Sequence, residues 1–309
     1  GDNNTAVGKS ALTANTTAGD NTAVGALSLD ANTTGDQLTA VGFSALSSNT
    51  TGNHNVAVGE AALATSTTGS DNVAVGKSAL NQNTTASWNT AVGTSALLAN
   101  TTGSNNTALG RIALDANTTG ATNTGLGSQA LTSNTTASGN TAVGVEALGA
   151  NTTGDYNVAV GSQTLVANTT ASNNTAVGYT ALAANTTGTR NNAFGYGAAD
   201  ATTTALDVAA FGTNSLGSNT TGTQNAGFGT NTLVLNTTGN YNTAIGHFAL
   251  ESSTGNSNTA VGNNSLLANT TASNNTAVGF EALKANTTGA NNVAVGRQAL
   301  FLNTTAGSN

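Results

Sequence analysis

The stretch that decides the fold is NTAVGKSALTANTTAGDNTAVG, residues 4–25, which contains the pentapeptide NTAVG twice. The glycine that ends the pentapeptide recurs every 17 residues, with a single interval of 16 residues between Gly246 and Gly262. It falls at Gly8, Gly25, Gly42, Gly59, Gly76, Gly93, Gly110, Gly127, Gly144, Gly161, Gly178, Gly195, Gly212, Gly229, Gly246, Gly262, Gly279 and Gly296. The chain is therefore eighteen copies of one unit, and such a period indicates a repeat architecture in which neighbouring copies stack.

We number each unit from its asparagine, so that the consensus reads N-[T/V]-A-V-G-x-x-A-L-x-x-N-T-T-G-x-x. Glycines and an Asn-Thr-Thr run in so short a unit disfavour a helix, and collagen would need a period of three. The sequence predicts an all-β fold, a parallel β-solenoid (β-roll) of about 18 coils of 17 residues, with two short strands in each coil. Residues 1–309 are expected to form a single continuous array, and its start and end in mid-pattern suggest a segment of a longer chain.

Large apolar side chains recur at two positions of the unit, the fourth and the ninth. Residues two apart in a strand share a face, so we expect the second, fourth and ninth positions to point inward. Where the fourth position becomes Phe, the second position holds a smaller or more polar residue. This pattern indicates that the second-position residue compensates for the larger volume of Phe inside one core. The predicted core residues are Val7, Leu12, Val24, Leu29, Val41, Leu46, Phe194, Phe211 and Phe228.

The third, fifth and eighth positions hold only small residues, which would form a bare strip along the stacked coils. Glycine in a strand marks a turn or a close backbone approach, and the strip fits either a simple corner or the packing of a second chain. We expect a subunit interface there, formed by Ala6, Gly8, Ala23, Gly25, Ala40 and Gly42. The expected partner is a second copy of the chain.

Asparagine occupies the first position in 16 units and the twelfth in 15. Identical amides one coil apart hydrogen-bond along the stack, as they do in cross-β assemblies. We therefore predict ladders that include Asn4, Asn15, Asn21, Asn32, Asn55 and Asn72. Each Asn-Thr-Thr run also matches the acceptor motif for N-glycosylation, and that interpretation stays open at this point.

Composition disfavours several classes of function. Charged residues are 6% of the chain and the net charge is −7. The sequence therefore predicts no basic surface of the kind that binds nucleic acid. Cysteine is absent, no apolar run reaches the ~18 residues of a membrane span, and the two histidines, His54 and His247, lie far apart in the sequence. We expect no catalytic site, no metal, no cofactor and no membrane insertion in this segment.

The stretch NVAVG, at residues 55–59, 72–76, 157–161 and 292–296, resembles the SVAIG signature of head repeats in trimeric autotransporter adhesins. The resemblance implies a left-handed parallel β-roll of three chains side by side at a bacterial surface, and related repeats occur in phage-like tail fibres. The unit here is longer than those head repeats, and its ANTTG half is not part of their pattern.

These observations together favour one function and leave two alternatives. We expect an extracellular or cell-surface structural fibre or adhesin-like shaft, homotrimeric, able to stack end to end into filaments, with a surface receptor that the sequence does not name. One alternative is a virion tail-fibre shaft. The other is an ice-binding β-solenoid that uses its threonine columns.

Overall fold

The computed structural model describes residues 1–309, and the chain contains β-strands and turns but no helix. Two compact units, Gly1–Tyr156 and Asn157–Asn309, are each built of nine coils. The strands of the first unit are β1 (Thr5–Val7), β2 (Thr22–Val24), β3 (Thr39–Val41), β4 (Val56–Val58), β5 (Val73–Val75), β6 (Thr90–Val92), β7 (Thr107–Leu109), β8 (Thr124–Leu126) and β9 (Thr141–Val143). Those of the second are β10 (Val158–Val160), β11 (Thr175–Val177), β12 (Asn192–Phe194), β13 (Ala209–Phe211), β14 (Ala226–Phe228), β15 (Thr243–Ile245), β16 (Thr259–Val261), β17 (Thr276–Val278) and β18 (Val293–Val295).

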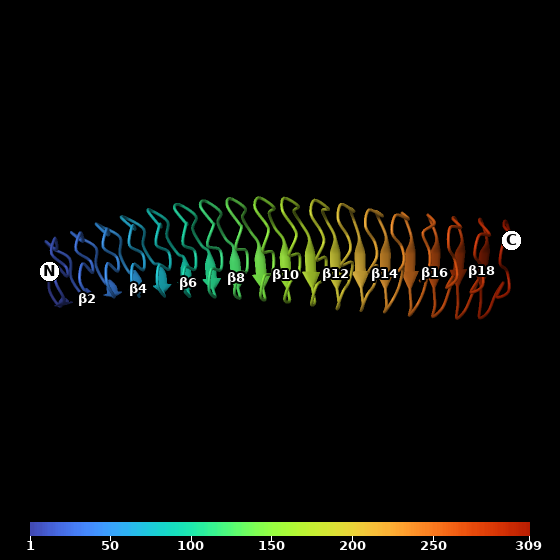
Figure 1. Ribbon diagram of the computed structural model, residues 1–309, viewed down its shortest axis with the longest axis horizontal. Coiled ribbons are helices and arrows are strands. Elements are labelled where there is room, and N and C mark those ends of the chain that lie inside the picture. The colour runs from blue at the N-terminus through green and yellow to red at the C-terminus, as the bar shows by residue number, and fades with distance from the viewer. The chain divides into compact units, whose positions relative to one another are not determined.

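Within each unit, every strand pairs in parallel with the strand of the next coil, as the row of arrows in Figure 1 shows. The register places each residue opposite its equivalent, for example Thr22 opposite Thr39. Backbone hydrogen bonds between neighbouring coils continue well beyond the strand, as from Leu29 N to Ala45 O and from Thr33 N to Thr50 O. The predicted parallel β-solenoid with a 17-residue spacing is confirmed.

Each coil contains one strand of three residues, not the two short strands that we expected. The second half of the coil is a series of turns, because the seventh and ninth positions have positive φ in every coil. Leu27 and Leu29, for example, have φ values of 60° and 50°. Left-handed backbone at alternate positions breaks an extended strand, so the coil bends where a second strand was predicted.

The fifth-position glycine is required by both its backbone angle and its neighbour in the next coil. At Gly76, φ is +136°, a region that is essentially restricted to glycine. A Cβ atom built on Gly76 would lie 2.6 Å from the carbonyl oxygen of Gly93. The invariance of this position therefore follows from the close stacking of one coil on the next.

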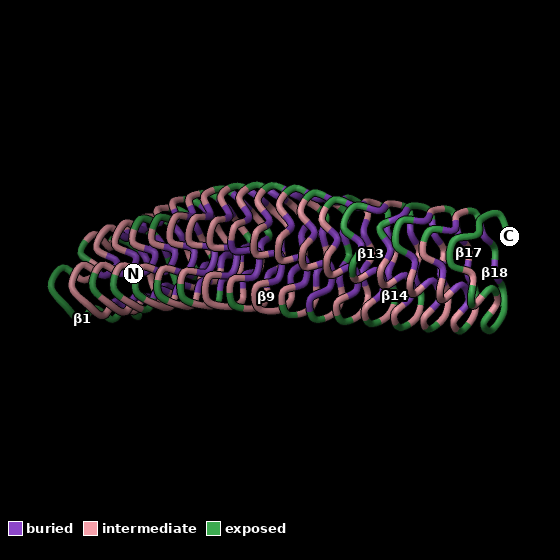
Figure 2. The backbone as a smooth tube through the Cα atoms, turned by 45° about the vertical axis from the view of Figure 1, so that its right-hand side comes forward, coloured by how far each residue is buried: buried purple, intermediate pink, exposed green.

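The interior of each unit is filled by the third, eighth and ninth positions, shown as the purple inner surface in Figure 2. Ala23, Ala45 and Leu46 are fully buried. The space beside the third position is narrow: a Cβ atom on Gly125 would already touch Leu114 Cδ1 of the preceding coil at 3.4 Å. Only small residues therefore fit on the inner side of the strand.

The expectation that the second and fourth positions point inward is wrong. Val7, Val24, Val41, Phe194, Phe211 and Phe228 lie on the outer side of the coil, where they are half-buried or exposed. The strand alternates as predicted, but the interior is already filled by leucine and asparagine side chains, so the smaller residue faces inward. The ninth-position prediction is correct, since Leu29 and Leu46 are fully buried and Leu12, in the first coil, is half-buried.

Within the strip of small residues, the third and eighth positions are likewise not an outer surface, and the fifth-position glycines of the inner coils are half-buried. Ala23 and Ala40 are fully buried inside the coil, and Gly25 and Gly42 stack on the glycines of neighbouring coils. Ala6 and Gly8 are exposed only because they belong to the first coil. The predicted interface at Ala6, Gly8, Ala23, Gly25, Ala40 and Gly42 is therefore wrong for a physical reason: these residues pack within one chain.

The predicted asparagine ladders are present. At the twelfth position the side-chain amide of most asparagines donates to the side-chain oxygen of the preceding one, as from Asn49 to Asn32 at 2.9 Å and from Asn117 to Asn100 at 2.8 Å. The members of the two columns are buried, apart from those in the end coils: Asn4 and Asn15 are half-buried, whereas Asn21, Asn32, Asn55 and Asn72 are at most 1% exposed.

The first-position column connects the two halves of each coil. Asn72 Oδ1 accepts a hydrogen bond from the backbone N–H of Asn89 in the next coil at 3.0 Å. The Asn72 amide also donates to the carbonyl of Ala86 at 2.9 Å, and Asn83 donates to that same carbonyl at 3.0 Å. One inward carbonyl thus accepts both buried amides of its coil, which satisfies polar groups that would otherwise be costly to bury.

The single 16-residue interval removes a residue that the interior does not need. In that coil the fourteenth-position threonine, exposed in most other coils, is missing. Asn242 still donates to Gly255 O at 2.8 Å, and Asn258 N still donates to Asn242 Oδ1 at 3.0 Å. The deletion is therefore absorbed at an outer turn, while the first-position ladder continues through it.

Candidate functional site

The outward second and fourth positions form a continuous surface on each unit, which we call the outer sheet face. Its fourth position is apolar in all eighteen coils, and its second position is Thr in eleven of them. Neither position carries a charged residue in any coil. The face is therefore a regular, uncharged lattice of half-buried apolar and hydroxyl side chains, built by strand pairing alone.

The apolar side chains of this face remain accessible to solvent. Val58 is 36% exposed, Leu109 is 50% exposed and Phe228 is 41% exposed, although each has neighbours above and below it in the stack. Isolated exposed apolar residues are ordinary on a soluble protein, whereas contiguous apolar patches usually mark an interaction site. The outer sheet face is contiguous within each unit, so it is the candidate functional site.

In the second unit the outer sheet face carries a column of stacked rings. Phe194 and Phe211 have ring centroids 4.7 Å apart, and Phe211 and Phe228 have theirs 4.9 Å apart, with an interplanar angle of 9° in both pairs. The in-register pairing of β12, β13 and β14 produces this geometry, because it places the three rings one coil apart. Stacked aromatic pairs add to the stability gained by burial.

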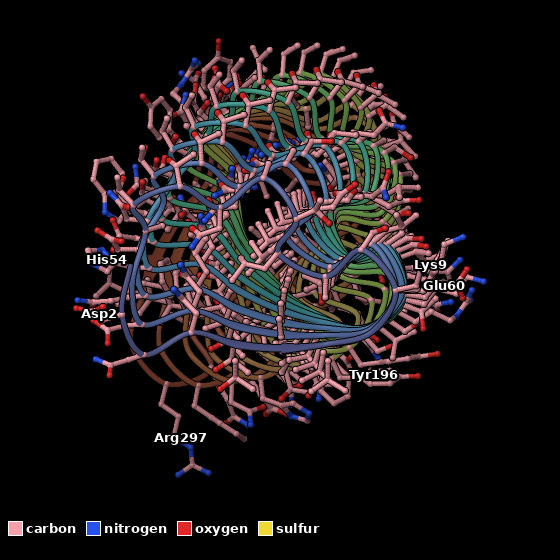
Figure 3. The ribbon with its side chains drawn as sticks, turned by 90° about the vertical axis from the view of Figure 1, so that its left-hand side faces the viewer. Asp2, Lys9, His54, Glu60, Tyr196 and Arg297 are labelled. Atoms are coloured by element: carbon pink, nitrogen blue, oxygen red, sulfur yellow. The ribbon has the colours of Figure 1, made fainter.

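Charged residues lie outside this face, mainly at the sixth, tenth and seventeenth positions. Figure 3 shows Lys9 and Glu60 together on one flank of their unit, while Asp2 and His54 point outward elsewhere. Ion pairs join adjacent coils, as between Lys77 and Glu60 at 3.2 Å. Such exposed pairs contribute little to stability, so these residues cover the surface without forming a site.

An exposed pair in the second unit has better geometry. Arg190 donates from Nε to Asp207 Oδ1 at 2.7 Å and from Nη2 to Asp207 Oδ2 at 3.0 Å. The hydrogen bond from Arg190 lowers the pKa of the Asp207 carboxyl below its ordinary value. Burial raises the pKa of Asp200, another carboxyl of this unit.

The asparagines of the Asn-Thr-Thr motifs are unsuited to glycan attachment in the folded chain. Asn32 and Asn100 are fully buried, and their amide nitrogens donate to neighbouring groups. The first threonine of most runs donates its hydroxyl to the next coil, as from Thr33 Oγ1 to Thr50 O at 2.9 Å. The motif therefore serves the stacking of coils.

The structure contains no pocket and no group of three or more His, Asp or Glu side chains that could hold a metal ion. It also contains no helix that could cross a membrane. No protein-family model matches the chain, and no curated protein matches its sequence. The outer sheet face and the ladders are consequently the features from which a function can be argued.

Proposed function

We propose that this chain is a non-catalytic structural fibre or adhesin-like shaft, outside the cell or on its surface, that associates with copies of itself through the outer sheet face. One observation carries the proposal: the fourth position is apolar in every coil although it points away from the interior. The interior does not require this, because the third, eighth and ninth positions already fill it. A partner that covers the outer side accounts for the pattern.

A second copy suits this face in chemistry and size. The face has no charge, so two copies can approach without burying an unpaired ion. With ~4.8 Å between strands and a width of ~10 Å, nine coils offer about 430 Å². The face of one unit is therefore about half of the roughly 800 Å² per partner of a standard protein interface, and copies that pair both of their units reach that size. β-Sheets commonly pack face to face in this manner.

The number of copies and the assembly are proposed from the resemblance of the repeats. NVAVG resembles the head-repeat signature of trimeric autotransporter adhesins, which supports three parallel copies. Coils with unpaired strand edges also template further pairing, which supports growth into filaments. A shaft of this kind would present a receptor-binding element, and a virion tail fibre would use the same construction.

The test is a measurement of mass combined with charge placed on the face. Sedimentation equilibrium of the chain is expected to give a stable oligomer. Val41→Lys with Val75→Lys places two charges on the face and should dissociate it, with the β-type circular dichroism unchanged because both positions are outward. Thr34→Lys with Thr68→Lys adds the same charge at exposed turns of the same unit and should leave the oligomer intact.

A folded monomer in the unaltered chain at micromolar concentration contradicts self-association. Dissociation by the turn variants to the same extent as by the face variants would show that net charge, and not the face, controls the mass. Either result would favour the second candidate function, ice binding.

The regular array of threonines on the outer face is the observation that supports ice binding. Second-position threonines stand in register from coil to coil beside the fourth-position valines, as Thr22 does beside Val24. Such a regular lattice, repeating every ~4.8 Å, could order water in the pattern of a crystal plane. This candidate predicts thermal hysteresis from a monomer that is abolished by Val41→Lys with Val75→Lys. A stable oligomer without hysteresis contradicts it.

A further inference from the structure

The outer sheet face of the second unit differs from a uniform lattice at three successive coils. Phe194, Phe211 and Phe228 replace the smaller aliphatic residues found at the fourth position elsewhere in the chain, and their rings form one continuous stack. In the same coils the second position holds Asn192, Ala209 and Ala226, whereas the other six coils of the unit have Thr or Val there. Bulk is therefore gained in one column, and it is lost beside it at Ala209 and Ala226.

This exchange of volume lies on the outside of the coil. The inward residues of the three strands are Ala193, Ala210 and Gly227, so the interior keeps the small third position found throughout the chain. Asn192 is exposed, and Ala209 and Ala226 are half-buried. Interior packing gives no reason for a coordinated change on this side.

When two copies of a repeat protein associate, their axial register must be specified. The change in side-chain size at these three coils would specify it. Elsewhere the face repeats nearly unchanged every ~4.8 Å, so two copies displaced by a whole coil would meet almost the same chemistry. Weakly specified registers permit slippage and alternate pairings. A unique feature on the face would remove that degeneracy.

We propose that the phenylalanine column and the adjacent alanines, Ala209 and Ala226, fix the axial register between copies of this chain. In the matched register, the ring of Phe211 from one copy packs over Ala209 or Ala226 of its partner. A displacement of three coils would set the rings against Thr and Val at the second position, which overpacks the contact, and would leave gaps at the alanines. The inference rests on the proposed self-association and adds the residues that align it.

The test measures distances between copies with a spin label placed away from the face. The chain has no cysteine, so Thr221→Cys gives a single attachment point on an exposed turn. Double electron–electron resonance on the assembled protein should show one narrow distance between copies. The register variant combines Phe194→Val, Phe211→Val and Phe228→Val with Asn192→Thr, Ala209→Thr and Ala226→Thr, which makes these coils like the others.

The register variant should keep the mass of the assembly but show several distances, because displaced copies separate their labels by steps of ~4.8 Å along the stack. The control is Tyr179→Thr with Tyr196→Thr. It removes another stacked aromatic pair, with centroids 5.7 Å apart, from the sixth position outside the face. This control should keep the single distance.

Three outcomes would overturn the inference. A register variant that keeps the single distance shows that register is set elsewhere. A register variant that becomes monomeric shows that the rings supply affinity and not alignment. A monomeric unaltered chain, established by mass before any label is used, overturns the proposed self-association itself and is thereby distinguished from the other two.

Discussion

Ser66 follows Asn49 in the buried twelfth-position column, and neither the Ser66 hydroxyl nor the Asn49 side-chain oxygen has a hydrogen-bond partner. In most other coils the equivalent oxygen accepts from an asparagine amide, as Asn100 does from Asn117 at 2.8 Å. The serine side chain is too short to reach its neighbour. The ladder is therefore interrupted between these two coils.

Ser66→Asn should complete the ladder and stabilise the protein. The new amide would donate to Asn49 Oδ1, and relief of two buried unpaired groups is worth about 1–2 kcal/mol. Urea unfolding of the two proteins measures the difference. The converse change, Asn117→Ser, opens the same gap beside Asn100 and should destabilise by a similar amount; equal stabilities in all three proteins would mean that the ladder bonds contribute nothing net.

The ladder also shows which part of the fold the sequence predicts well. Parallel stacking and asparagine columns follow from the period, because equivalent residues such as Asn32 and Asn49 must lie one coil apart once coils stack. The period does not say which side of the strand faces inward. We assigned the larger residue, Val24, to the interior, but the inner space is narrow and accepts only Ala23.

Two sequence signals could have corrected that assignment. The side chain at the third position is never larger than that of alanine in any coil, whereas the fourth position ranges from Val to Phe. A position that accepts only small residues is typical of a crowded site. The seventh position accepts Gly197 and Asn214, residue types that suit left-handed backbone. That tolerance indicates a turn where we predicted a strand.

Ile112 occupies one of these left-handed positions, with φ of 51°. A β-branched residue is poorly suited to this conformation, which costs ordinary residues roughly 1–2 kcal/mol. Ile112→Asn should therefore stabilise the protein by about 1 kcal/mol, since Asn214 and Asn231 adopt the same backbone at the equivalent position. Thermal unfolding provides the measurement.

The control for Ile112 keeps the hydrophobicity and moves the side-chain branch from Cβ to Cγ. Leu27 has φ of 60° at the equivalent position, so Ile112→Leu should give a stability between those of the unaltered chain and Ile112→Asn. An asparagine variant less stable than the unaltered chain would show that apolar contacts of Ile112 outweigh its backbone strain.

The Arg190–Asp207 pair predicts a small dependence of stability on acid. Because Arg190 lowers the pKa of Asp207 in the folded chain, the pair stabilises the fold above the unfolded pKa of about 3.9. That contribution is lost as the pH falls through the lower folded value. Asp207→Asn should reduce stability at pH 7 and remove this part of the loss on acidification. In an Arg190→Gln background, Asp207→Asn should have no such effect; a persistent effect would assign the dependence to another group.

Gly227 and Gly125 are the two glycines at the inward third position, and their surroundings predict opposite responses to an added methyl group. A Cβ atom on Gly227 would lie 2.5 Å from Ser215 Oγ and 2.7 Å from Thr232 Oγ1, two eighth-position hydroxyls that hydrogen-bond to each other at 2.7 Å. Beside Gly125 the eighth position is Ala130, and the nearest atoms to a Cβ are at 3.4 Å.

Gly227→Ala should therefore destabilise the protein by about 1–3 kcal/mol through overpacking, whereas Gly125→Ala should stabilise it by about 0.4–1 kcal/mol by restricting the unfolded chain. Combining Gly227→Ala with Ser215→Ala and Thr232→Ala removes the obstructing hydroxyls, so in that background the alanine should be neutral or stabilising. Urea unfolding of the single and combined variants gives the coupling between the sites. Gly227→Ala could instead lower the free energy of unfolding by the same amount with and without the hydroxyls. In that case the backbone itself requires glycine, and the size of the eighth-position side chains does not limit the size of the third-position residue.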